Sequence, residues 1–509
     1  MDDRLTALKR RLGELADLGH ALALANWDQQ TMMPPRGAQA RSESIATLTR
    51  ISHELFVGAE TGRLIDGAER ELRDADPDSD DSRLVQLVRR RWEKARRVPP
   101  ELASDLARAA SIAQEAWVGA RERSDFASFA PYLETNLKLA RRYVECHLGQ
   151  PEFECAYDVL LDDYEPRMPT AQLARLFAQL RDQLVSMLGA LPRDGAVDEW
   201  PLHARFAVEG QRRLVREVVS MMGFDDSSWR LDDTVHPFAT RIGVGDVRIT
   251  TRWDEDYFPM ALYGAMHECG HGLYEAGLPA ALARLPTGAP ESLGMHESQS
   301  RLWENMVGRS RAFCEVLAPR IAALAGGRLA SLDAEALYRA VNAVRPGFIR
   351  VEADEVTYGL HVILRFELEQ ELIEGRLTVA ELPEAWNARV REYLGLEVAD
   401  DADGVLQDVH WSAGLIGYFP TYALGNLIAG QLWERACDEL PGLEDLIAAG
   451  DLAPLREWLR ERVHRHGAKF TTGELLEREL GAPIQVGPFA DYLRAKLASV
   501  YGPPAGRSF

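Results

Sequence analysis

Residues 267–271 read His-Glu-Cys-Gly-His, an H-E-x-x-H pentad inside a stretch whose apolar residues recur with helical spacing. On an α-helix, residues four apart lie about one turn apart, so the imidazoles of His267 and His271 leave the same face. Two neutral imidazoles so placed can bind one metal ion, and Glu268 is placed to act on a water molecule beside that ion. The pentad therefore predicts a metal site on a helix, which we expect to span residues 255–276 and to end near Gly277.

A metal site that does catalysis usually has three protein ligands and one open position. Glu297 follows His271 by 26 residues, on what the sequence predicts to be the next helix, and a helix crossing would bring its carboxylate to the two imidazoles. Its neighbour His296 is the alternative ligand. A His-His-Glu set favours zinc, although Co²⁺ or Mn²⁺ could substitute. Cys269 lies on another face of the helix and is expected to be a packed thiol.

The composition excludes several classes of protein. No apolar run reaches about 18 residues, so no transmembrane helix is expected, and the charged N-terminal segment lacks the apolar core of a signal peptide. The net charge of −21 argues against binding to nucleic acid or to anionic membranes. The five cysteines are an odd number and widely spread, which is typical of reduced thiols and predicts a cytoplasmic protein.

Most of the chain has the pattern of a mainly α protein, and no Gly/Ser-rich or Pro-rich linker divides it. Residues 1–234 are expected to be mainly helical, and residues 254–509 to be helical and to carry the metal site. Between them, residues 235–253 read VHPFATRIGVGDVRITTRW, with Gly243 and Gly245 between two β-branched, alternating runs. This pattern predicts a β-hairpin, and hence a small antiparallel sheet beside the metal helix.

Taken together, several motifs resemble those of the Taq-type thermostable metallocarboxypeptidases, over nearly the whole length. They read WDQQTMMPPRGAQAR (27–41), YDVLLDDYEP (157–166), HPFATRIGVGDVRITTRW (236–253), HECGH (267–271), HESQSRLWENMVGRS (296–310), IRVEADEVTY (349–358), GVLQDVHWSAGLIGYFPTYALGN (404–426) and HRHGAKFT (464–471). The resemblance implies one domain over residues 1–509, in the form of a bilobed helical body with a deep active-site groove. It also implies a homodimer that removes C-terminal amino acids one at a time, with broad specificity and poor activity on a C-terminal proline.

The resemblance further suggests how a free C-terminal carboxylate is recognised. The family carries its carboxylate-binding arginine in the motif that here contains Arg350. Arginine suits this role because its charge is permanent and its contact with a carboxylate can be bidentate. The alternative is a structural ion pair between Arg350 and one of the nearby acidic residues Glu352, Asp354 and Glu355.

Segment 404–426 supplies candidates for stabilising an oxyanion. In related glutamate-zincins, a His and a Tyr separated by about ten residues do this work. Here Tyr418 and Tyr422 follow His410 by eight and twelve residues, so neither spacing fits cleanly. We favour His410 with Tyr422, and Tyr418 as the substitute. Either tyrosine could instead be a packing residue with a satisfied hydroxyl.

Asp246 and Arg248 belong to a stretch that resembles the family's D-x-R-x-T strand. Its position just before the metal helix suggests an edge strand that could pair with a peptide backbone and bind substrate. The alternative is a structural hairpin with an Asp–Arg ion pair. His464 and His466 are expected to support or cap neighbouring elements rather than to bind metal.

The sequence thus favours a zinc carboxypeptidase in which Glu268 is the general base. The alternative enzyme is an oligopeptidase or dipeptidase with the same metal chemistry. A catalytically inactive peptide-binding scaffold is a third hypothesis, and the intact set of His267, Glu268, His271 and Glu297 argues against it.

Overall fold

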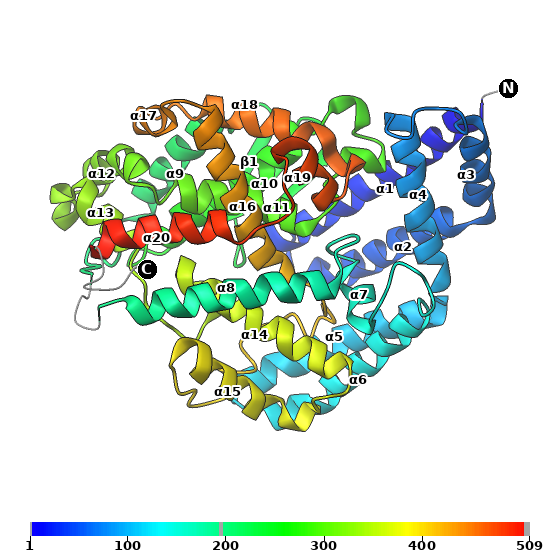
Figure 1. Ribbon diagram of the computed structural model, residues 1–509, viewed down its shortest axis with the longest axis horizontal. Helices are drawn as coiled ribbons and strands as arrows, with labels where there is room; N and C mark the ends of the chain where they lie inside the picture. Colours follow the sequence, from blue (N-terminus) through cyan, green and yellow to red (C-terminus); the bar gives the residue numbers. More distant parts are fainter. Residues whose placement is uncertain (1–2, 193–196, 503–509) are drawn as a thin grey trace.

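The computed structural model describes residues 3–192 and 197–502, and nearly all of them lie in or between helices (Figure 1). The helices before the sheet are α1 (Arg4–Thr31), α2 (Ala38–Val57), α3 (Ala59–Glu71), α4 (Asp80–Arg97), α5 (Pro100–Glu122), α6 (Phe126–Glu145), α7 (Ala156–Leu161), α8 (Thr170–Ala190) and α9 (Val208–Met222). Those after it are α10 (Pro259–Gly277), α11 (Leu293–Arg301), α12 (Arg311–Ala325), α13 (Ala334–Val341), α14 (Glu355–Ile373), α15 (Leu382–Leu394), α16 (Pro420–Glu439), α17 (Leu443–Ala448), α18 (Ala453–Arg462), α19 (Thr472–Leu480) and α20 (Gly487–Tyr501).

Short 3-10 and π turns link several of these helices. They are η1 (Pro35–Gly37), η2 (Ala280–Leu282), η3 (Pro286–Gly288), η4 (Leu302–Val307, a π turn), η5 (Gly327–Ser331), η6 (Arg350–Glu352), η7 (Val379–Glu381) and η8 (His464–Lys469). The prediction of a mainly α fold is therefore confirmed. In the part of the chain that the structure describes, no helix is both long and apolar enough to cross a membrane.

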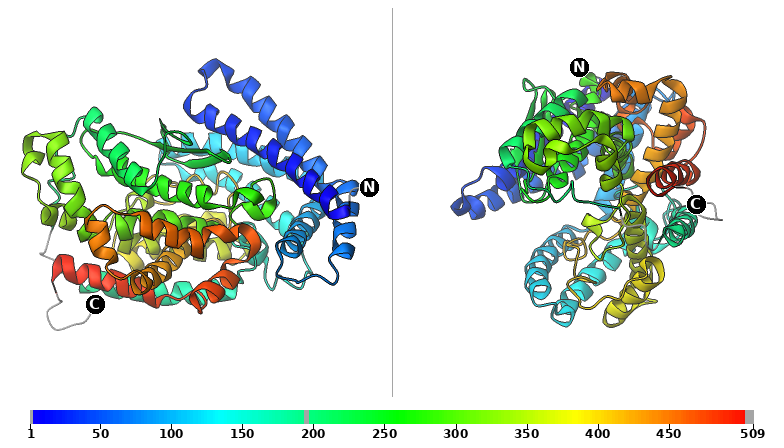
Figure 2. Two further views of the ribbon diagram at one scale, coloured as in Figure 1. Left: turned by 90° about the horizontal axis from the view of Figure 1, so that it is seen from above. Right: turned by 90° about the vertical axis from the view of Figure 1, so that its left-hand side faces the viewer.

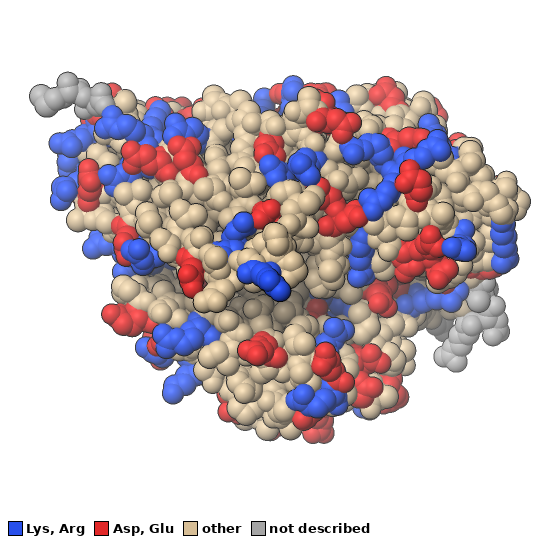
Figure 3. Space-filling view, turned by 180° about the vertical axis from the view of Figure 1, so that it is seen from behind, with Lys and Arg blue, Asp and Glu red and all other residues tan. Residues whose placement is uncertain are grey.

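The helices form two lobes, as predicted. The right-hand view of Figure 2 shows α5, α6, α14 and α15, in cyan and yellow, as one group below the rest of the molecule. The rear surface is hollowed between the two groups (Figure 3). A single cluster of buried apolar side chains runs through both lobes, while a second, smaller cluster joins α1, α3 and α4.

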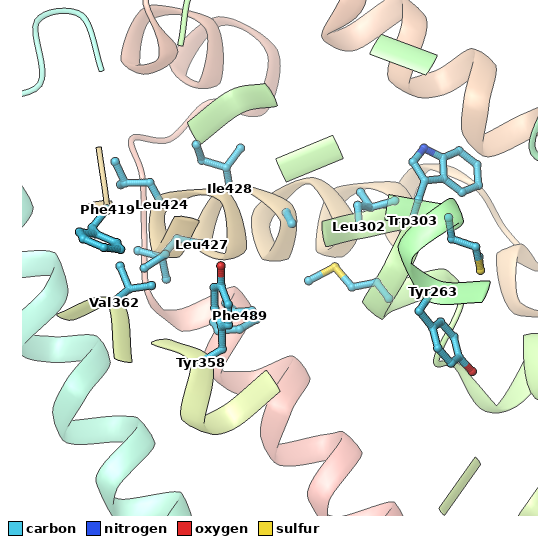
Figure 4. Packing of buried hydrophobic residues seen from close by; sticks show 14 of the residues in the cluster. Tyr263, Leu302, Trp303, Tyr358, Val362, Phe419, Leu424, Leu427, Ile428 and Phe489 are labelled. Carbon is cyan, nitrogen blue, oxygen red and sulfur yellow. The ribbon is translucent and has the colours of Figure 1, made fainter. Parts of the chain in front are cut away.

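Helix α16 lies at the centre of the larger cluster. Figure 4 shows three of its side chains, Leu424, Leu427 and Ile428, with their neighbours from other helices. The neighbours labelled there include Tyr358 and Val362 of α14, Phe489 of α20, Leu302 and Trp303 of η4 and Tyr263 of α10. All of these side chains are buried, so the elements around the metal site rest on a shared apolar core.

The three strands are β1 (Trp229–Asp233), β2 (Ala239–Gly243) and β3 (Asp246–Thr251), in the order β1-β3-β2. The predicted hairpin is confirmed: β2 runs antiparallel to β3, with Thr240 opposite Arg248. The sheet is mixed rather than purely antiparallel, because β1 pairs with β3 in parallel. Hydroxyl Oγ1 of Thr251 donates to the carbonyl of Ala261 at 3.0 Å, which ties the end of β3 to helix α10.

The residues at which helix α10 begins and ends are explained by the sequence close to them. It begins at Pro259, four residues later than predicted, because a proline at the first helical position lacks only an N–H that the helix would leave unpaired. It ends at Gly277, as predicted, just before Leu278 and Pro279.

Glycine allows α10 to lie very close to α11. A Cβ at Gly270 would stand 2.7 Å from the carbonyl oxygen of Gln299 and 2.8 Å from Cα of Ser300. Both obstacles are backbone atoms, which cannot rotate away. The close approach brings the helix that carries Glu297 against the helix that carries the two histidines.

We therefore expect Gly270→Ala to destabilise the fold by about 1–3 kcal/mol, through overpacking, and to weaken metal binding. Urea unfolding and a chelator competition would measure the two effects. Gly19→Ala on the exposed face of α1 is the matched control, because its Cβ would meet no atom within 4 Å. That control should gain roughly 0.5–1 kcal/mol from the lower flexibility of alanine. Equal effects of the two substitutions would contradict the packing argument.

Candidate metal centre

Helices α10 and α11 bring three possible metal ligands together, as predicted. Glu297 Oε2 lies 3.6 Å from His267 Nε2 and 3.4 Å from His271 Nε2. The ligand atoms of the three residues all lie within 4.8 Å of one another. Two imidazole nitrogens and one carboxylate oxygen are donors that zinc accepts, so the residues fit a divalent transition metal.

A further contact fixes the orientation of His267. Glu304 Oε2, on the π turn η4, lies 2.9 Å from His267 Nδ1, which leaves Nε2 of that ring to face Glu297. Such a carboxylate–histidine pair is typical of metal sites. Burial would raise the pKa of Glu304, but His267 and nearby arginines hold that pKa well below its usual range. Glu304 therefore accepts the hydrogen bond as a carboxylate.

His296, the alternative ligand, contacts a ligand instead. Its Nδ1 lies 2.5 Å from Nδ1 of His271, and its Nε2 lies 3.1 Å from Glu275 Oε1. Burial lowers the pKa of His271 to about 3, which keeps that imidazole neutral, as metal binding requires. The structure therefore groups Glu297, rather than His296, with the two pentad histidines.

The start of α11 is fixed by polar contacts. Ser292 caps the helix, because its Oγ accepts a hydrogen bond from Met295 N at 2.9 Å. Glu165 accepts from Ser292 Oγ at 2.8 Å and from Gly294 N. Burial raises the pKa of Glu165 to about 7. These contacts hold the helix that presents Glu297.

Glu268 and Cys269 lie between the two histidines on α10. Glu268 is buried, with 7% of its surface exposed, and burial raises its pKa to about 7 against the lowering effect of His267. A carboxylate with a pKa near neutrality is suited to exchanging protons. Cys269 is a free and fully buried thiol, as predicted.

Arg350 lies on η6 with 5% of its surface exposed. Its ion partner is Asp408, not one of the three predicted acidic residues: Nε and Nη2 lie 3.0 and 2.8 Å from Asp408 Oδ1. Nη1 donates to the hydroxyl of Tyr358 at 3.1 Å. Arg365 contacts the other oxygen of Asp408, its Nε lying 2.6 Å from Oδ2. Burial would raise the pKa of Asp408, but the two guanidinium groups hold it far below its usual range.

The predicted oxyanion residues meet beside Arg350. His410 Nε2 lies 3.1 Å from the hydroxyl of Tyr422, and the guanidinium carbon of Arg350 lies 4.8 Å from the centre of the Tyr422 ring. The ring of Tyr418 is centred 5.4 Å from both His410 and Tyr422. Burial, followed by the charge of Arg350, lowers the pKa of His410 to about 3, so its imidazole is neutral near pH 7. The chain thus brings His410, Tyr418, Tyr422 and Arg350 together.

The prediction that Asp246 and Arg248 lie on an edge strand is wrong. Strand β3, which carries Asp246 and Arg248, is the central strand of the sheet, because β1 pairs with the side that we expected to be free. Asp246 and Arg248 form a bidentate ion pair, with both N···O distances at 2.8 Å. Arg248 also lies over the ring of Trp27, 4.2 Å from its centre. Their direct contact with substrate stays a prediction.

His464 and His466 contact side chains of neighbouring helices, which is the supporting role predicted for them. His464 is buried, and its Nε2 lies 2.9 Å from Gln299 Oε1 on α11. His466 Nε2 lies 2.9 Å from Glu479 Oε1.

A cavity of about 710 Å³ opens near the start of α11, between α4, α5 and α6. Charged side chains of both signs line it, among them Arg90, Lys94, Asp162 and Glu291. Ala413 and Gly414 also line it, and they belong to the segment that carries His410 and Tyr418. Neither the three metal-ligand residues nor the oxyanion candidates His410, Tyr418 and Tyr422 are among the residues that line this cavity.

Comparison with known proteins agrees with this geometry. Residues 7–497 match the family described as carboxypeptidase Taq (M32) metallopeptidase. The chain is 43% identical to thermostable carboxypeptidase 1 of Thermus thermophilus over 505 residues, which cover 98% of each chain. It is 35% identical to carboxypeptidase 1 of Bacillus subtilis over 491 residues, which cover 96% of this chain and 97% of the relative.

Solved structures agree as well. The crystal structure of an M32 carboxypeptidase from Deinococcus radiodurans superposes with a TM-score of 0.94 at 41% identity, covering 98% of this chain and all of that one (100%). A carboxypeptidase structure from Pyrococcus furiosus gives a TM-score of 0.93 at 34% identity, covering 97% of this chain and 99% of that one. With its His-His-Glu group on crossing helices, the chain belongs to the carboxypeptidase Taq (M32) family of metallopeptidases and is a metallocarboxypeptidase.

Proposed function

We propose that this metallocarboxypeptidase uses a zinc ion held by His267, His271 and Glu297 to release single amino acids from the C-terminus of peptides. The metal site is supported above all by the short distances from Glu297 Oε2 to the Nε2 atoms of His267 and His271. The specificity is proposed to be broad, with poor activity on a C-terminal proline, as the family resemblance implies. A homodimer, a cytoplasmic location and a single domain over residues 1–509 stay predictions.

A bound zinc ion supplies Lewis-acid polarisation of a carbonyl and a lower pKa for a water ligand. Within the protein, Glu268 is proposed to take the proton of the attacking water and to pass it to the leaving amine. Its buried position and raised pKa support this exchange. Glu304 holds the imidazole of His267 through Nδ1, so the ring is oriented before substrate arrives.

Arg350 is proposed to bind the free carboxylate of the substrate. A guanidinium has five N–H donors. Asp408 and Tyr358 take three of them, which leaves two for a ligand. In the free enzyme the buried guanidinium of Arg350 is not left without a counter-charge, because it already pairs with Asp408, which it shares with Arg365. The guanidinium is thereby fixed in place, which lowers the cost of ordering it when substrate binds.

His410 and Tyr422 are proposed to donate hydrogen bonds to the oxyanion that develops on the scissile carbonyl, with Tyr418 as the substitute. Their support is the contact between His410 Nε2 and the Tyr422 hydroxyl, next to Arg350. A donor aimed at such an oxyanion typically contributes about 3–4 kcal/mol to catalysis.

A time course with one defined peptide tests this function. We expect the zinc-loaded protein to produce a ladder of products, each one residue shorter at the C-terminus, by mass spectrometry. The same peptide with a C-terminal amide should be a much poorer substrate, because it lacks the negatively charged carboxylate that Arg350 is proposed to bind. Chelation of the metal should stop both reactions. Internal fragments as first products, or full-rate cleavage of the amide, would instead indicate an oligopeptidase.

A further inference from the structure

Arg301, the last residue of α11, lies between two carboxylates of the metal centre. Its Nε donates to Glu297 Oε1 at 2.6 Å, and its Nη1 donates to Glu304 Oε2 at 3.4 Å. Glu297 is a metal-ligand residue, and Glu304 holds the ligand His267. Only 14% of the Arg301 side chain is exposed, so its contact with Glu297 is a charge-assisted hydrogen bond shielded from water.

The two oxygens of Glu297 therefore have different surroundings. Oε2 faces both imidazole Nε2 atoms, at 3.6 and 3.4 Å, and accepts a hydrogen bond from the neutral hydroxyl of Ser300 at 3.1 Å. Oε1 is taken by Arg301. Helix α16 closes the space behind the side chain, because a Cβ at Gly425 would stand 2.5 Å from Cγ of Glu297. Glu297 has little room to turn, and presenting both oxygens to a metal would break its contact with Arg301.

Arg301 is itself held in place by an aromatic ring. Its guanidinium carbon lies 4.2 Å from the ring centre of Tyr358, a cation–π distance. Tyr358 is buried, and its hydroxyl is fixed by Nη1 of Arg350 at 3.1 Å. The position of the Arg301 guanidinium is thus set by Tyr358, itself held by Arg350, as well as by the two carboxylates.

We propose that Arg301 is a positioning residue that restricts Glu297 to one metal-binding oxygen, Oε2. The inference rests on the proposed metal site and concerns how that site keeps an open position. A carboxylate that binds through both oxygens occupies one more coordination position than a carboxylate that binds through one. By holding Oε1, Arg301 keeps that position available for water or substrate, as catalysis by such a site requires.

The test uses the full-length protein loaded with Co²⁺, whose visible absorption is strong in four-coordinate sites and weaker when the coordination number rises. The wild type should show strong bands. Arg301→Met, which has similar length but no charge, should show weaker bands, because Oε1 is released to the metal. Its kcat should fall about 10- to 100-fold. Arg301→Lys, which can donate to one carboxylate, should recover part of the band intensity.

Arg301→Met leaves two buried carboxylates with less positive charge, so folding is a separate risk. Combining it with Glu304→Gln removes one negative charge and so restores the charge balance. The amide oxygen introduced by that second substitution can still accept a hydrogen bond from His267 Nδ1. The double variant should show the same weakened bands. Arg311→Met is the matched control, because that arginine is exposed at the start of α12, where it pairs with Glu335. Its spectrum should equal that of the wild type.

Two results would overturn the proposal: weak bands in the wild type, or unchanged bands in folded Arg301→Met, alone or combined with Glu304→Gln. The first of these needs no substitution, so the proposal does not depend on a variant that folds. Failure of the metal site itself is distinguishable, because the wild type would then take up no Co²⁺ at all. That outcome would overturn both this proposal and the proposed function.

Discussion

Replacing Glu268 by glutamine should leave the metal bound and reduce kcat by about 10²- to 10⁴-fold, the usual contribution of a general acid–base group. Glutamine has nearly the same shape, so α10 and its histidines should stay in place. It cannot accept a proton at neutral pH, so the attacking water would not be deprotonated. Metal content by atomic absorption and kcat on one peptide would measure the two properties separately.

The control for Glu268→Gln is Glu392→Gln, the same chemical change on the exposed face of α15. It should keep full activity and full metal content. If Glu268→Gln turned over at the wild-type rate with metal bound, Glu268 could not be the general base. Loss of metal from that variant would mean that Glu268 supports the site rather than the proton transfer.

The sequence predicted the metal helix well because its signal is local. The pentad places His267 and His271 on one face of any α-helix, and the proline and glycine near the ends of α10 limit its length. The prediction of Glu297 as the third ligand required only the assumption that the next helix crosses α10. Gly270 shows why that crossing is close, since a Cβ at this position would strike the backbone of α11. Gly425 allows a different close approach, that of α16 to Glu297.

Other features depend on contacts that are distant in the sequence. Strand β1 reads Trp-Arg-Leu-Asp-Asp (229–233), which lacks a β-branched run, and it forms because β3 offers a parallel partner. Its presence makes β3 a central strand and removes the edge on which we expected a peptide to pair.

The ion-pair partners considered in the alternative for Arg350 also missed the observed one, because that partner is distant in the sequence. The sequence offers three acidic residues within five positions, whereas the fold supplies Asp408, 58 residues away. Of the three nearer residues, Asp354 caps α14 and Glu355 pairs with Lys496 at 2.6 Å. Local spacing cannot choose between a near and a distant carboxylate, because tertiary packing decides which one is buried beside the guanidinium.

Arg350→Met should reduce kcat/KM on a peptide with a free C-terminus by roughly 10²- to 10³-fold. One bidentate contact between guanidinium and carboxylate comprises two hydrogen bonds to a charged group, each worth about 1.5–3 kcal/mol. The expected loss of activity corresponds to only part of their combined energy. The slow cleavage of the C-terminally amidated peptide should change little, because that substrate makes no ion pair with Arg350. The ratio of the two rates therefore measures carboxylate recognition alone.

The fold should tolerate Arg350→Met better than most losses of a buried charge. Arg365 stays paired with Asp408, at 2.6 Å, so the carboxylate is not left without a cation. Arg345→Met is the matched control: Arg345 lies five positions earlier, is largely exposed and pairs with Glu199 at 3.0 Å. It should preserve the preference for the free carboxylate. Equal losses on the free and the amidated peptide in Arg350→Met would instead assign Arg350 to the support of Asp408 and Tyr358, since a purely structural defect slows both substrates alike.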